Sequence, residues 1–470
     1  MSASILDDMA AIIGAKNVVT DADAMVPYLK EWRDLFRGKA QAVVRPGSTQ
    51  EVAELVKLAA KTGTRIVPQG GNTGLVGGQI PIAEGREIVL SLQRMDKIRS
   101  IDAQSDTMTV EAGLTLQKAQ VAAEGAGRLF PLSLASEGSC TIGGNLSTNA
   151  GGTAVLAYGN ARELCMGLEV VLADGRIWNG LRQLRKDNTG YDLKNLFIGA
   201  EGTLGIITAA VLKLFPLPAA RATAFLAVPD PEAALMLLNA AKAGAGGTLT
   251  TFELMSRLGV EFVLKHASGT RDPLSEPSPW YVLMEVSAQS ASGLDEAVEA
   301  FLGEALEQGL VTDAALAGSL TQRADFWKLR EMLSEVQTYE GGSIKHDVSV
   351  PLHAVPAFIA RASEAVIAMV PGCRPLPFGH LGDGNIHFNV SQPVGGDKAV
   401  FIAGWSAMNQ AVHAIVSEMH GSISAEHGIG RLKRDLLPGV KDPVELALMK
   451  TLKATLDPQG ILNPGAVLTM

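Results

Sequence analysis

The chain is poor in cysteine, in basic charge and in long uncharged apolar runs. Its three cysteines, Cys140, Cys165 and Cys373, are widely spaced and form no CxxC pair, which excludes a disulfide framework and fits a reducing compartment. A formal net charge of −9 argues against a general nucleic-acid binder, which usually carries a basic face. No uncharged apolar run reaches the roughly 18 to 20 residues that a membrane helix needs.

The N-terminus, MSASILDDMAAIIG, has early acids and no basic start before an apolar core, so it does not read as a secretory signal. These features predict a cytoplasmic protein without a membrane span. With 47% hydrophobic and 19% charged residues the composition is that of a globular protein. A length of 470 residues predicts two or three domains, because one core does not grow that large.

Two common nucleotide-binding motifs are also missing, G-x-G-x-x-G and G-x-x-x-x-G-K-[ST], so neither a Rossmann site nor a P-loop is supported. Glycine is instead dense at residues 70–78 and 138–152. Backbone N–H groups around such glycines can form an anion-binding nest, and no Cβ keeps a diphosphate from the backbone. Plain turns are the alternative for either segment taken alone.

The order of elements changes near Pro216 and Pro218. Before them, strand-like residues 41–46, a helix from Ser48 to Gly63 and strand-like residues 64–71 predict a crossover between parallel neighbouring strands. After them, the alternation of strands and helices predicts an α+β domain with an antiparallel sheet.

Two histidines flank a glycine-rich loop in PFGHLGDGNIHFN, residues 377–389. If the chain folds back there as a hairpin, His380 and His387 come close enough to share an ion. Two imidazoles and the carboxylate of Glu426 would make a mixed N/O site that suits Zn²⁺ or a similar divalent ion. His427 follows Glu426 and can take a proton. The alternative is two polar residues that decorate a glycine loop.

Taken together, these segments resemble one flavoprotein superfamily. The chain resembles the flavin domain of the vanillyl-alcohol-oxidase-like FAD enzymes in PGSTQEVAELVKLA, PQGGNTGLVGG, SEGSCTIGGNLSTNAGG and FIGAEGTLGIIT. It resembles the D-2-hydroxyacid dehydrogenase branch in GHLGDGNIHFN, SAEHGIGRLK and DPQGILNPG, with wording most similar to the D-2-hydroxyglutarate dehydrogenases. The resemblance runs from about residue 40 to the C-terminus.

The resemblance implies an α+β fold with a vanillyl-alcohol-oxidase-type FAD-binding domain and an α+β substrate (cap) domain with an antiparallel sheet. The expected limits are 1–40 for an N-terminal helical leader, 41–218 for the FAD-binding domain, 219–415 for the cap domain, and 416–470 for a C-terminal helical segment that returns to the FAD domain and completes the active site.

The resemblance also implies bound FAD, with its diphosphate on the first glycine loop. The implied FAD contacts are Gly70, Gly71, Asn72, Thr73, Gly74, Gly138, Ser139, Thr141, Gly143, Gly144, Thr148, Gly205, Ile207 and Asn463. Relatives that attach the flavin covalently do so through a histidine in the first loop. This chain has Asn72 there, so we expect non-covalent FAD.

The resemblance implies metal ligands at His380 and His387 in the cap domain and at Glu426 in the C-terminal segment, and it implies His427 as the catalytic base. The implied substrate contacts are Arg330, Ser334, Lys345 and Asn389. Ser334 stands where the family often has Thr, and the alternative for Arg330 is a solvated helix residue paired with Glu331 or Asp325. The remaining histidines, His266, His346, His353, His413 and His420, are expected to be structural, the last two on one face of a helix. Asp383 is expected to cap its turn.

The expected reaction is oxidation of a D-2-hydroxyacid to the 2-oxoacid by hydride transfer to flavin N5. Arg330 and Lys345 supply two cations beyond the metal, which favours a dicarboxylate such as D-2-hydroxyglutarate or D-malate. The alternatives are a D-lactate or glycolate dehydrogenase, a direct oxidase that uses oxygen and, outside enzymes, a non-catalytic metal- or nucleotide-binding module. The expected electron acceptor is an electron-transfer flavoprotein or a quinone, and a homodimer is considered.

Overall fold

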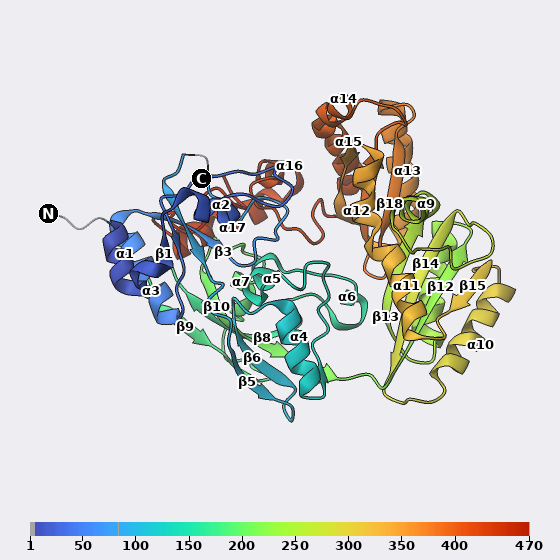
Figure 1. The fold of residues 1–470 in the computed structure, drawn as a ribbon, viewed down its shortest axis with the longest axis horizontal. Helices are drawn as coiled ribbons and strands as arrows, with labels where there is room; N and C mark the ends of the chain where they lie inside the picture. Colours follow the sequence, from blue (N-terminus) through green and yellow to red (C-terminus); the bar gives the residue numbers. More distant parts are fainter. Residues whose placement is uncertain (1–4, 83, 470) are drawn as a thin grey trace. The chain divides into compact units, whose positions relative to one another are not determined.

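The computed structural model describes residues 5–82 and 84–469, which divide into two compact units (Figure 1). The first unit contains the chain up to Gly151, the segment Gly159–Leu217 and the chain from His427 onward. The second contains Gly152–Tyr158 and Pro218–Glu426. Helices and strands of both units confirm the predicted α+β class.

The first unit is built on two larger sheets and one small one, with strand orders β1-β2-β4-β3, β5-β6-β10-β8-β9 and β11-β7. Its strands are β1 (Val18–Val19), β2 (Val43–Val44), β3 (Arg65–Gln69), β4 (Glu87–Ser91), β5 (Ile98–Asp102), β6 (Thr107–Glu111), β7 (Arg128–Leu129), β8 (Cys165–Val171), β9 (Ile177–Gly180), β10 (Ile206–Lys213) and β11 (Phe215–Pro216).

Its helices are α1 (Ile5–Ile13), η1 (Ala15–Asn17), α2 (Ala22–Leu29), α3 (Thr49–Thr62), α4 (Leu116–Gly125), α5 (Ile142–Thr148), α7 (Lys194–Phe197), η4 (Arg434–Leu436), α16 (Leu437–Val440) and α17 (Pro443–Leu456). The N-terminal segment is not helical throughout, because β1 pairs with β2 in the four-stranded sheet.

Helix α3 is the crossover that the sequence predicts. The Ser48 hydroxyl accepts a hydrogen bond from the Glu51 N–H at its start, and Gly63 ends it in the left-handed region with φ 69°. The two strands that it joins are parallel but are not neighbours, because β4 lies between them and pairs with both. All five residues of β4 are buried, as a central strand between two parallel neighbours requires. The predicted adjacency is therefore wrong.

The second unit is built on an eight-stranded sheet of order β15-β12-β14-β13-β18-β19-β16, with β17 also paired to β19. Every pairing in it is antiparallel, as predicted. Its strands are β12 (Ala220–Val228), β13 (Thr248–Ser256), β14 (Trp280–Ala288), β15 (Asp313–Leu316), β16 (Ser343–Ile344), β17 (Asp347–Ser349), β18 (Arg374–His380) and β19 (Asn385–Ser391).

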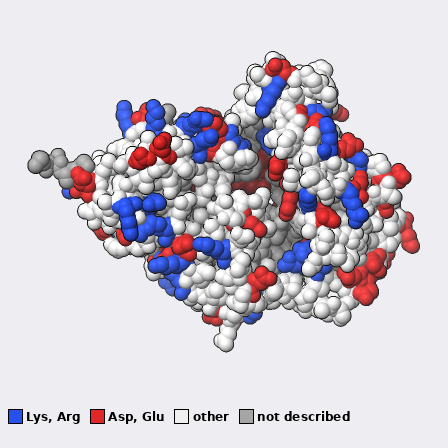
Figure 2. Space-filling model, viewed as in Figure 1, with Lys and Arg blue, Asp and Glu red and all other residues white. Residues whose placement is uncertain are grey.

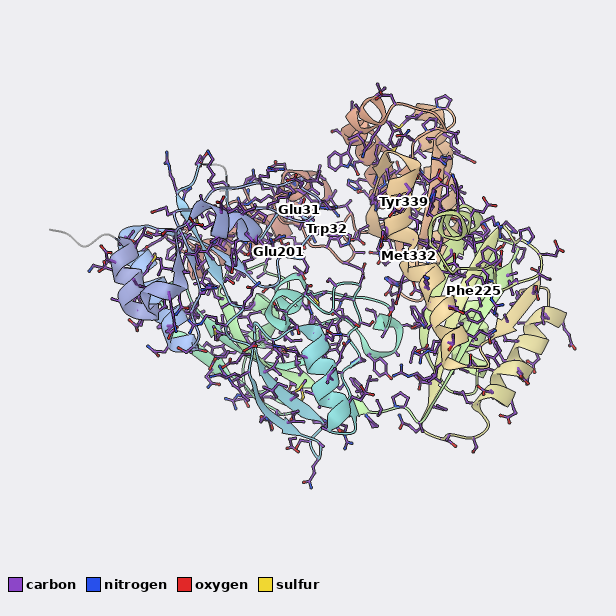
Figure 3. The ribbon with its side chains drawn as sticks, in the orientation of Figure 1. Glu31, Trp32, Glu201, Phe225, Met332 and Tyr339 are labelled. Carbon is purple, nitrogen blue, oxygen red and sulfur yellow. The ribbon has the colours of Figure 1, made fainter. Side chains whose placement is uncertain are left out.

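Helices cover both faces of this sheet. One apolar core lies under α8 (Pro231–Gly244), α10 (Leu294–Glu307), α13 (Val355–Met369) and α15 (Trp405–Glu418). The core on the other face lies under α9 (Arg257–His266), α11 (Leu320–Glu331) and α12 (Leu333–Val336). Phe225 on β12 belongs to this second core (Figure 3), and its ring centroid lies 5.8 Å from that of Phe326 on α11. The remaining helices are α6 (Val155–Tyr158), η2 (Gln337–Glu340), η3 (Leu352–Ala354) and α14 (Lys398–Ala403).

One helical segment, Leu352–Met369, is long and apolar enough to cross a membrane by length and composition alone. It carries Arg361 and Glu364, and its buried residues Val355, Phe358 and Val366 belong to the core of the second unit. We interpret it as a core helix. Lys and Arg side chains are interspersed with Asp and Glu over the face that Figure 2 shows.

Candidate active site

Strands β18 and β19 form the hairpin that the sequence predicts. Their register pairs Phe378 with His387 and His380 with Asn385, so the two histidines lie diagonally on one face. Their ring centroids are 5.7 Å apart. Gly384 in the connecting loop has φ 83°, and a Cβ there would lie 2.3 Å from the Val350 carbonyl oxygen. Glycine is therefore required at that position.

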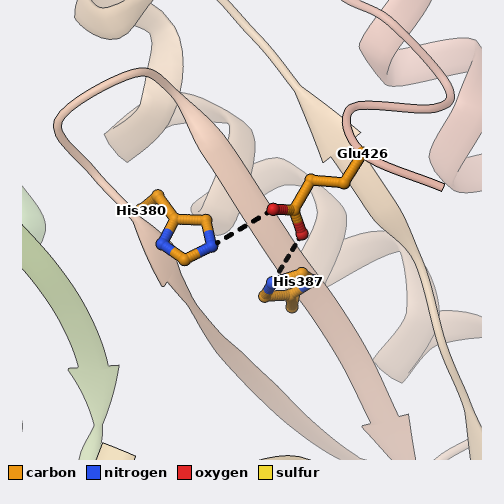
Figure 4. A group of neighbouring side chains, drawn as sticks. All are labelled: His380, His387 and Glu426. Carbon is orange, nitrogen blue, oxygen red and sulfur yellow. Dashed lines mark ion pairs between the residues drawn. The ribbon is translucent and has the colours of Figure 1, made fainter. Parts of the chain in front are cut away.

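Glu426 meets both imidazoles, as Figure 4 shows. Its Oε1 lies 3.5 Å from His380 Nε2 and its Oε2 lies 3.6 Å from His387 Nε2. The Glu426 N–H donates to Asp347 Oδ2 at 3.0 Å, and Asp347 sits on β17 directly opposite His387. The sheet thus holds the last residue of the second unit against the hairpin.

The separations of these ligand atoms fit a small divalent cation. Ligands at about 2.0–2.1 Å from a tetrahedral Zn²⁺ lie about 3.3–3.4 Å from one another. The observed 3.5 and 3.6 Å, which join the two imidazoles to different oxygens of Glu426, are close to that spacing, and one atom from each of the three residues lies within 4.8 Å of the others. Two imidazole nitrogens and one carboxylate leave a coordination position open, which is the pattern of catalytic rather than structural zinc sites.

The local charges also favour a cation. Three carboxylates, Glu253, Asp347 and Glu426, surround the histidines. The positive groups among them are the Arg330 guanidinium and the His380 imidazole, so these five groups carry a net charge of −1. Burial disfavours the charged form of both imidazoles. In His380 the charge and hydrogen bond of Glu253 outweigh burial and raise the pKa to about 10, whereas in His387 burial prevails and lowers the pKa to about 4.

Glu253 is a site residue that the sequence does not reveal. It lies on β13 with no exposed surface. His380 Nδ1 lies 2.6 Å from its Oε1, and Arg330 Nε donates to its Oε2 at 2.7 Å. Burial opposes its charge, but His380 and Arg330 together lower the pKa of Glu253 to about 2. The only signal in the sequence is an acid between Phe252 and Leu254 in the segment TLTTFELMS.

Arg330 is not a solvated helix residue. It lies near the end of α11 with 8% of its surface exposed, and its guanidinium carbon is 5.0 Å from the centroid of the Phe378 ring. Its partner is Glu253, so the alternative of a pairing with Glu331 or Asp325 is wrong. The guanidinium lies on the same side of the sheet as the two histidines, because α11 covers that face.

The other predicted substrate residues also lie in the second unit. Lys345 is exposed, and its Nζ donates to the backbone carbonyl of Ser334 at 2.9 Å. Asn389 is buried on β19, two residues beyond His387 and on the same face, and its Nδ2 donates to Gln337 Oε1 at 3.1 Å. The structure thus places Lys345 in contact with Ser334. It places Asn389 on the same face of the sheet as His387.

Two residues expected to be structural, His266 and Asp383, have structural contacts, and one expectation about His420 is wrong. Helix α15 ends at Glu418, so His420 lies beyond it with φ 57° and does not share a helix face with His413. His266 Nε2 lies 2.6 Å from Glu340 Oε1. Asp383 Oδ1 accepts a hydrogen bond from the Asn385 N–H at 3.0 Å, which is the expected turn contact.

The two glycine segments of the first unit lie against each other. A Cβ on Gly70 would lie 2.2 Å from Thr141 Oγ1, and one on Gly71 would lie 1.9 Å from the Ser139 carbonyl oxygen. Glycines are therefore required for this close approach. Gly205 is needed for packing, because its Cβ would lie 2.6 Å from Val170 Cγ1.

Two asparagines anchor the same region. Asn72 has φ 57°, and its Nδ2 donates to the carbonyls of Pro27 and Lys30 at 2.8 and 2.9 Å. Asn463 Nδ2 donates to the carbonyl of Glu201 at 2.7 Å. Glu201, labelled in Figure 3, is itself buried in the first unit and is a second residue that the sequence does not single out.

Comparisons with known proteins agree with this architecture. Residues 40–180 match the family described as FAD binding domain, and residues 217–467 match the family described as FAD linked oxidases, C-terminal domain. Among solved structures, p-cresol methylhydroxylase has a TM-score of 0.75 at 17% identity and covers 98% of this chain and 96% of its own. Alkyldihydroxyacetonephosphate synthase has a TM-score of 0.74 at 19% identity, over 98% and 84% of the two chains. These likenesses show the fold.

Sequence relatives are more similar. The mitochondrial D-2-hydroxyglutarate dehydrogenase of Arabidopsis thaliana is 38% identical over 97% of this chain and 80% of its own length. That of Bos taurus is 39% identical over 97% and 82%. The D-2-hydroxyglutarate dehydrogenase of Stutzerimonas stutzeri is 35% identical over 99% and 98%. The chain therefore belongs to the FAD-linked oxidase family and is an FAD-dependent oxidoreductase that acts on a CH–OH group.

Proposed function

We propose that the chain oxidises D-2-hydroxyglutarate to its 2-oxoacid with non-covalently bound FAD and a divalent ion held by His380, His387 and Glu426. The observation that carries the proposal is the convergence of these three side chains, at 3.5 and 3.6 Å, in a chain whose relatives bear the name D-2-hydroxyglutarate dehydrogenase over 97% of its length. The net charge of the surrounding groups and the open coordination position support it.

When bound, FAD would supply a two-electron acceptor and a divalent ion would lower the pKa of the substrate's 2-hydroxyl group. The protein's own part is to orient the hydroxyacid and to move one proton. His427 follows Glu426 directly in the chain, so a single loop carries both the third ligand and the base. An imidazole nitrogen of His427 would take the hydroxyl proton as the hydrogen on the substrate's Cα leaves as a hydride.

Arg330 and Lys345 would hold the substrate's carboxylates. Arg330 uses Nε for Glu253, and among the described residues neither of its Nη atoms makes a hydrogen bond, so that edge can bind a carboxylate. Because Glu253 pairs with Arg330 and neutralises its charge, the positive charge available to the substrate's carboxylates is smaller than the sequence suggests. The choice of D-2-hydroxyglutarate over D-malate therefore rests on the relatives more than on a count of charges.

The FAD contacts expected from the sequence form the cofactor part of the proposal. The close packing of Gly70 and Gly71 on Ser139 and Thr141 supports a continuous glycine surface in the first unit. Asn72 supports non-covalent binding, because it stands in place of a histidine and directs its Nδ2 to the carbonyls of two residues in the N-terminal segment.

Reduced FAD must pass its electrons on. All three cysteines are buried and make no disulfide, and an iron–sulfur cluster normally uses four cysteine ligands. We therefore propose an external acceptor, an electron-transfer flavoprotein or a quinone. A direct oxidase is the second candidate, which stopped-flow reoxidation of the reduced protein by oxygen would reveal.

A cytoplasmic location and a homodimer stay predictions. The names of the plant and animal relatives place those proteins in mitochondria.

A substrate screen tests the proposal. Purified, metal-loaded protein with an artificial dye acceptor should show its highest kcat/KM with D-2-hydroxyglutarate, a lower value with D-malate, and little turnover with D-lactate or glycolate. A preference for D-lactate or glycolate over both dicarboxylates would overturn the substrate assignment. A purified protein without a flavin absorption band would instead favour a non-catalytic binding module.

A further inference from the structure

A single buried carboxylate joins the metal-ligand triad to the arginine that faces the substrate. We propose that Glu253 is a positioning residue that holds His380 and Arg330 in one fixed geometry, so that metal affinity and substrate-carboxylate binding depend on the same side chain. This inference rests on the proposed function. It concerns a fully buried residue on β13, the strand that pairs directly with β18 of the hairpin.

The first of the two Glu253 contacts fixes the imidazole of His380. Glu253 lies opposite His380 in the β13–β18 register, and 2.6 Å separate Oε1 from Nδ1. A carboxylate accepts only, so Nδ1 carries a hydrogen, and Nε2, the atom that faces Glu426, is the nitrogen left to bind an ion. Without this partner, neither the tautomer nor the ring angle of His380 is set.

The second Glu253 contact fixes the guanidinium of Arg330. Its Nε donates to Glu253 Oε2 at 2.7 Å, and the Phe378 ring lies beneath its guanidinium carbon at 5.0 Å. The hydrogen bond sets the direction of the guanidinium, and the ring contact holds it over Phe378. Since Nε is already bonded, a substrate carboxylate can use only the edge formed by Nη1 and Nη2. Glu253 thereby determines which edge of the Arg330 guanidinium is free to bind the substrate's carboxylate.

The contacts to His380 and Arg330 are coupled because both are made by the one carboxylate of Glu253. Among the described residues, its side-chain hydrogen bonds go to His380 and Arg330 alone. A fully buried carboxylate is stable only when it is paired, so a displacement of His380 or Arg330 would move Glu253 and, with it, the other partner. One Glu253 side chain thus ties the ion's ligand on β18 to the substrate contact on α11.

The same sheet offers a matched control. Glu285 on β14 is 5% exposed, and its Oε2 accepts hydrogen bonds from Arg323 Nε at 2.9 Å and from Trp327 Nε1 at 3.2 Å. It has the same residue type, the same kind of arginine partner on α11 and similar burial. None of its hydrogen bonds goes to His380, His387, Glu426 or Arg330. Loss of a buried carboxylate as such should therefore affect Glu253→Gln and Glu285→Gln alike.

The test measures Zn²⁺ affinity in the FAD-loaded, substrate-free protein by competition with a chromogenic chelator. Glu253→Gln should weaken Zn²⁺ binding by about 10- to 100-fold, the usual effect of removing a partner behind a metal-bound histidine. It should also raise KM for D-2-hydroxyglutarate more than it lowers kcat. Glu285→Gln should keep both the Zn²⁺ affinity and the KM of the wild type.

Equal Zn²⁺ affinity in Glu253→Gln and wild type would overturn the inference while the proposed function stands. No Zn²⁺ binding by the wild type would overturn both. A variant in which Zn²⁺ affinity falls while KM is unchanged would also overturn it, because the coupling to Arg330 would be absent. If Glu253→Gln does not fold, the charge-balanced double variant with Glu253→Gln and Arg330→Gln replaces it. Its Zn²⁺ affinity should be weak, whereas Arg330→Gln alone should bind Zn²⁺ more tightly than the double variant.

Discussion

The backbone N–H of Gly430 donates to both carboxylate oxygens of Glu201, at 3.1 and 2.9 Å, across 229 positions of sequence. Glu201 Oε1 also accepts from the Ile429 N–H at 2.7 Å. Glu201 has φ 50° and Gly430 has φ 52°, so two left-handed residues meet at this junction. Because His427 is only two residues before Ile429, this contact fixes the segment that carries the proposed base.

Replacing Glu201 by Gln should loosen that segment. The amide keeps one acceptor oxygen and loses the charge, so the free energy of unfolding should fall by about 1–3 kcal/mol. The value of kcat should fall as well, with FAD content retained. Denaturant titration and steady-state kinetics measure both effects, with Glu54→Gln on the exposed face of α3 as control. Wild-type stability and wild-type kcat in Glu201→Gln would show that the contact has no such role.

Removal of the metal ion should abolish turnover without releasing FAD. Chelation followed by dialysis should give an inactive flavoprotein, and Zn²⁺ or a similar divalent ion should restore its activity. His387→Ala should reproduce the chelated state, because its Nε2 is one of the three proposed ligand atoms. His420→Asn should behave as wild type, since His420 is exposed and its left-handed backbone suits asparagine. Full activity in demonstrably metal-free protein would rule out the site.

Replacing His427 by Asn should separate chemistry from binding. The contents of Zn²⁺ and FAD should stay near those of the wild type, while kcat drops by roughly 10² to 10⁴, the usual contribution of a general base. Metal analysis, the flavin spectrum and kcat provide the three measurements. An unchanged kcat would mean that another group takes the hydroxyl proton.

Glu340 should make the protein sensitive to acid. Hydrogen bonds from His266, Lys265 and Arg374, at 2.6 to 2.7 Å, lower the pKa of Glu340 to about 2. A folded-state pKa below the unfolded value means that this stabilisation is complete above about pH 4.3 and is lost as the pH falls toward 2.

For partly screened surface pairs we expect about 1–3 kcal/mol from this cluster at neutral pH. Glu340→Gln should therefore lower the free energy of unfolding at neutral pH, and the difference from wild type should vanish as the pH approaches 2. Urea titrations across that range measure it, with Glu335→Gln on the exposed side of α12 as control. A difference that stays constant with pH would contradict the assigned pKa.

Local signals in the sequence predict the hairpin and the crossover helix well. The glycines between His380 and His387 indicate a turn that brings the two imidazoles together, and alternation along β19 places His387 and Asn389 on one face. Ser48 and Gly63 mark the ends of α3 because both caps are made by neighbouring residues. The insertion of β4 between β2 and β3 is a long-range choice of partner that no local pattern records.

The parts of the site that the sequence does not reveal all depend on long-range contacts. Strand β13 carries no turn or cap signal that separates it from its surroundings, and it brings Glu253 to His380 across 127 positions. The true partner of Arg330 is missed for the same reason, since the acids near it in sequence lie on its own helix. Glu201 and Gly430 are likewise brought together only by the folded chain.

Anaerobic mixing of the flavoprotein with substrate tests the central claim most directly, because it follows the half-reaction without any electron acceptor. When Zn²⁺-loaded protein is mixed with D-2-hydroxyglutarate, the absorption band of its oxidised flavin should disappear. L-2-hydroxyglutarate should leave the band unchanged. Chelated protein with the same FAD content should stay oxidised with either enantiomer. Equal bleaching in chelated and Zn²⁺-loaded protein, or no bleaching by any D-2-hydroxyacid, would contradict the account.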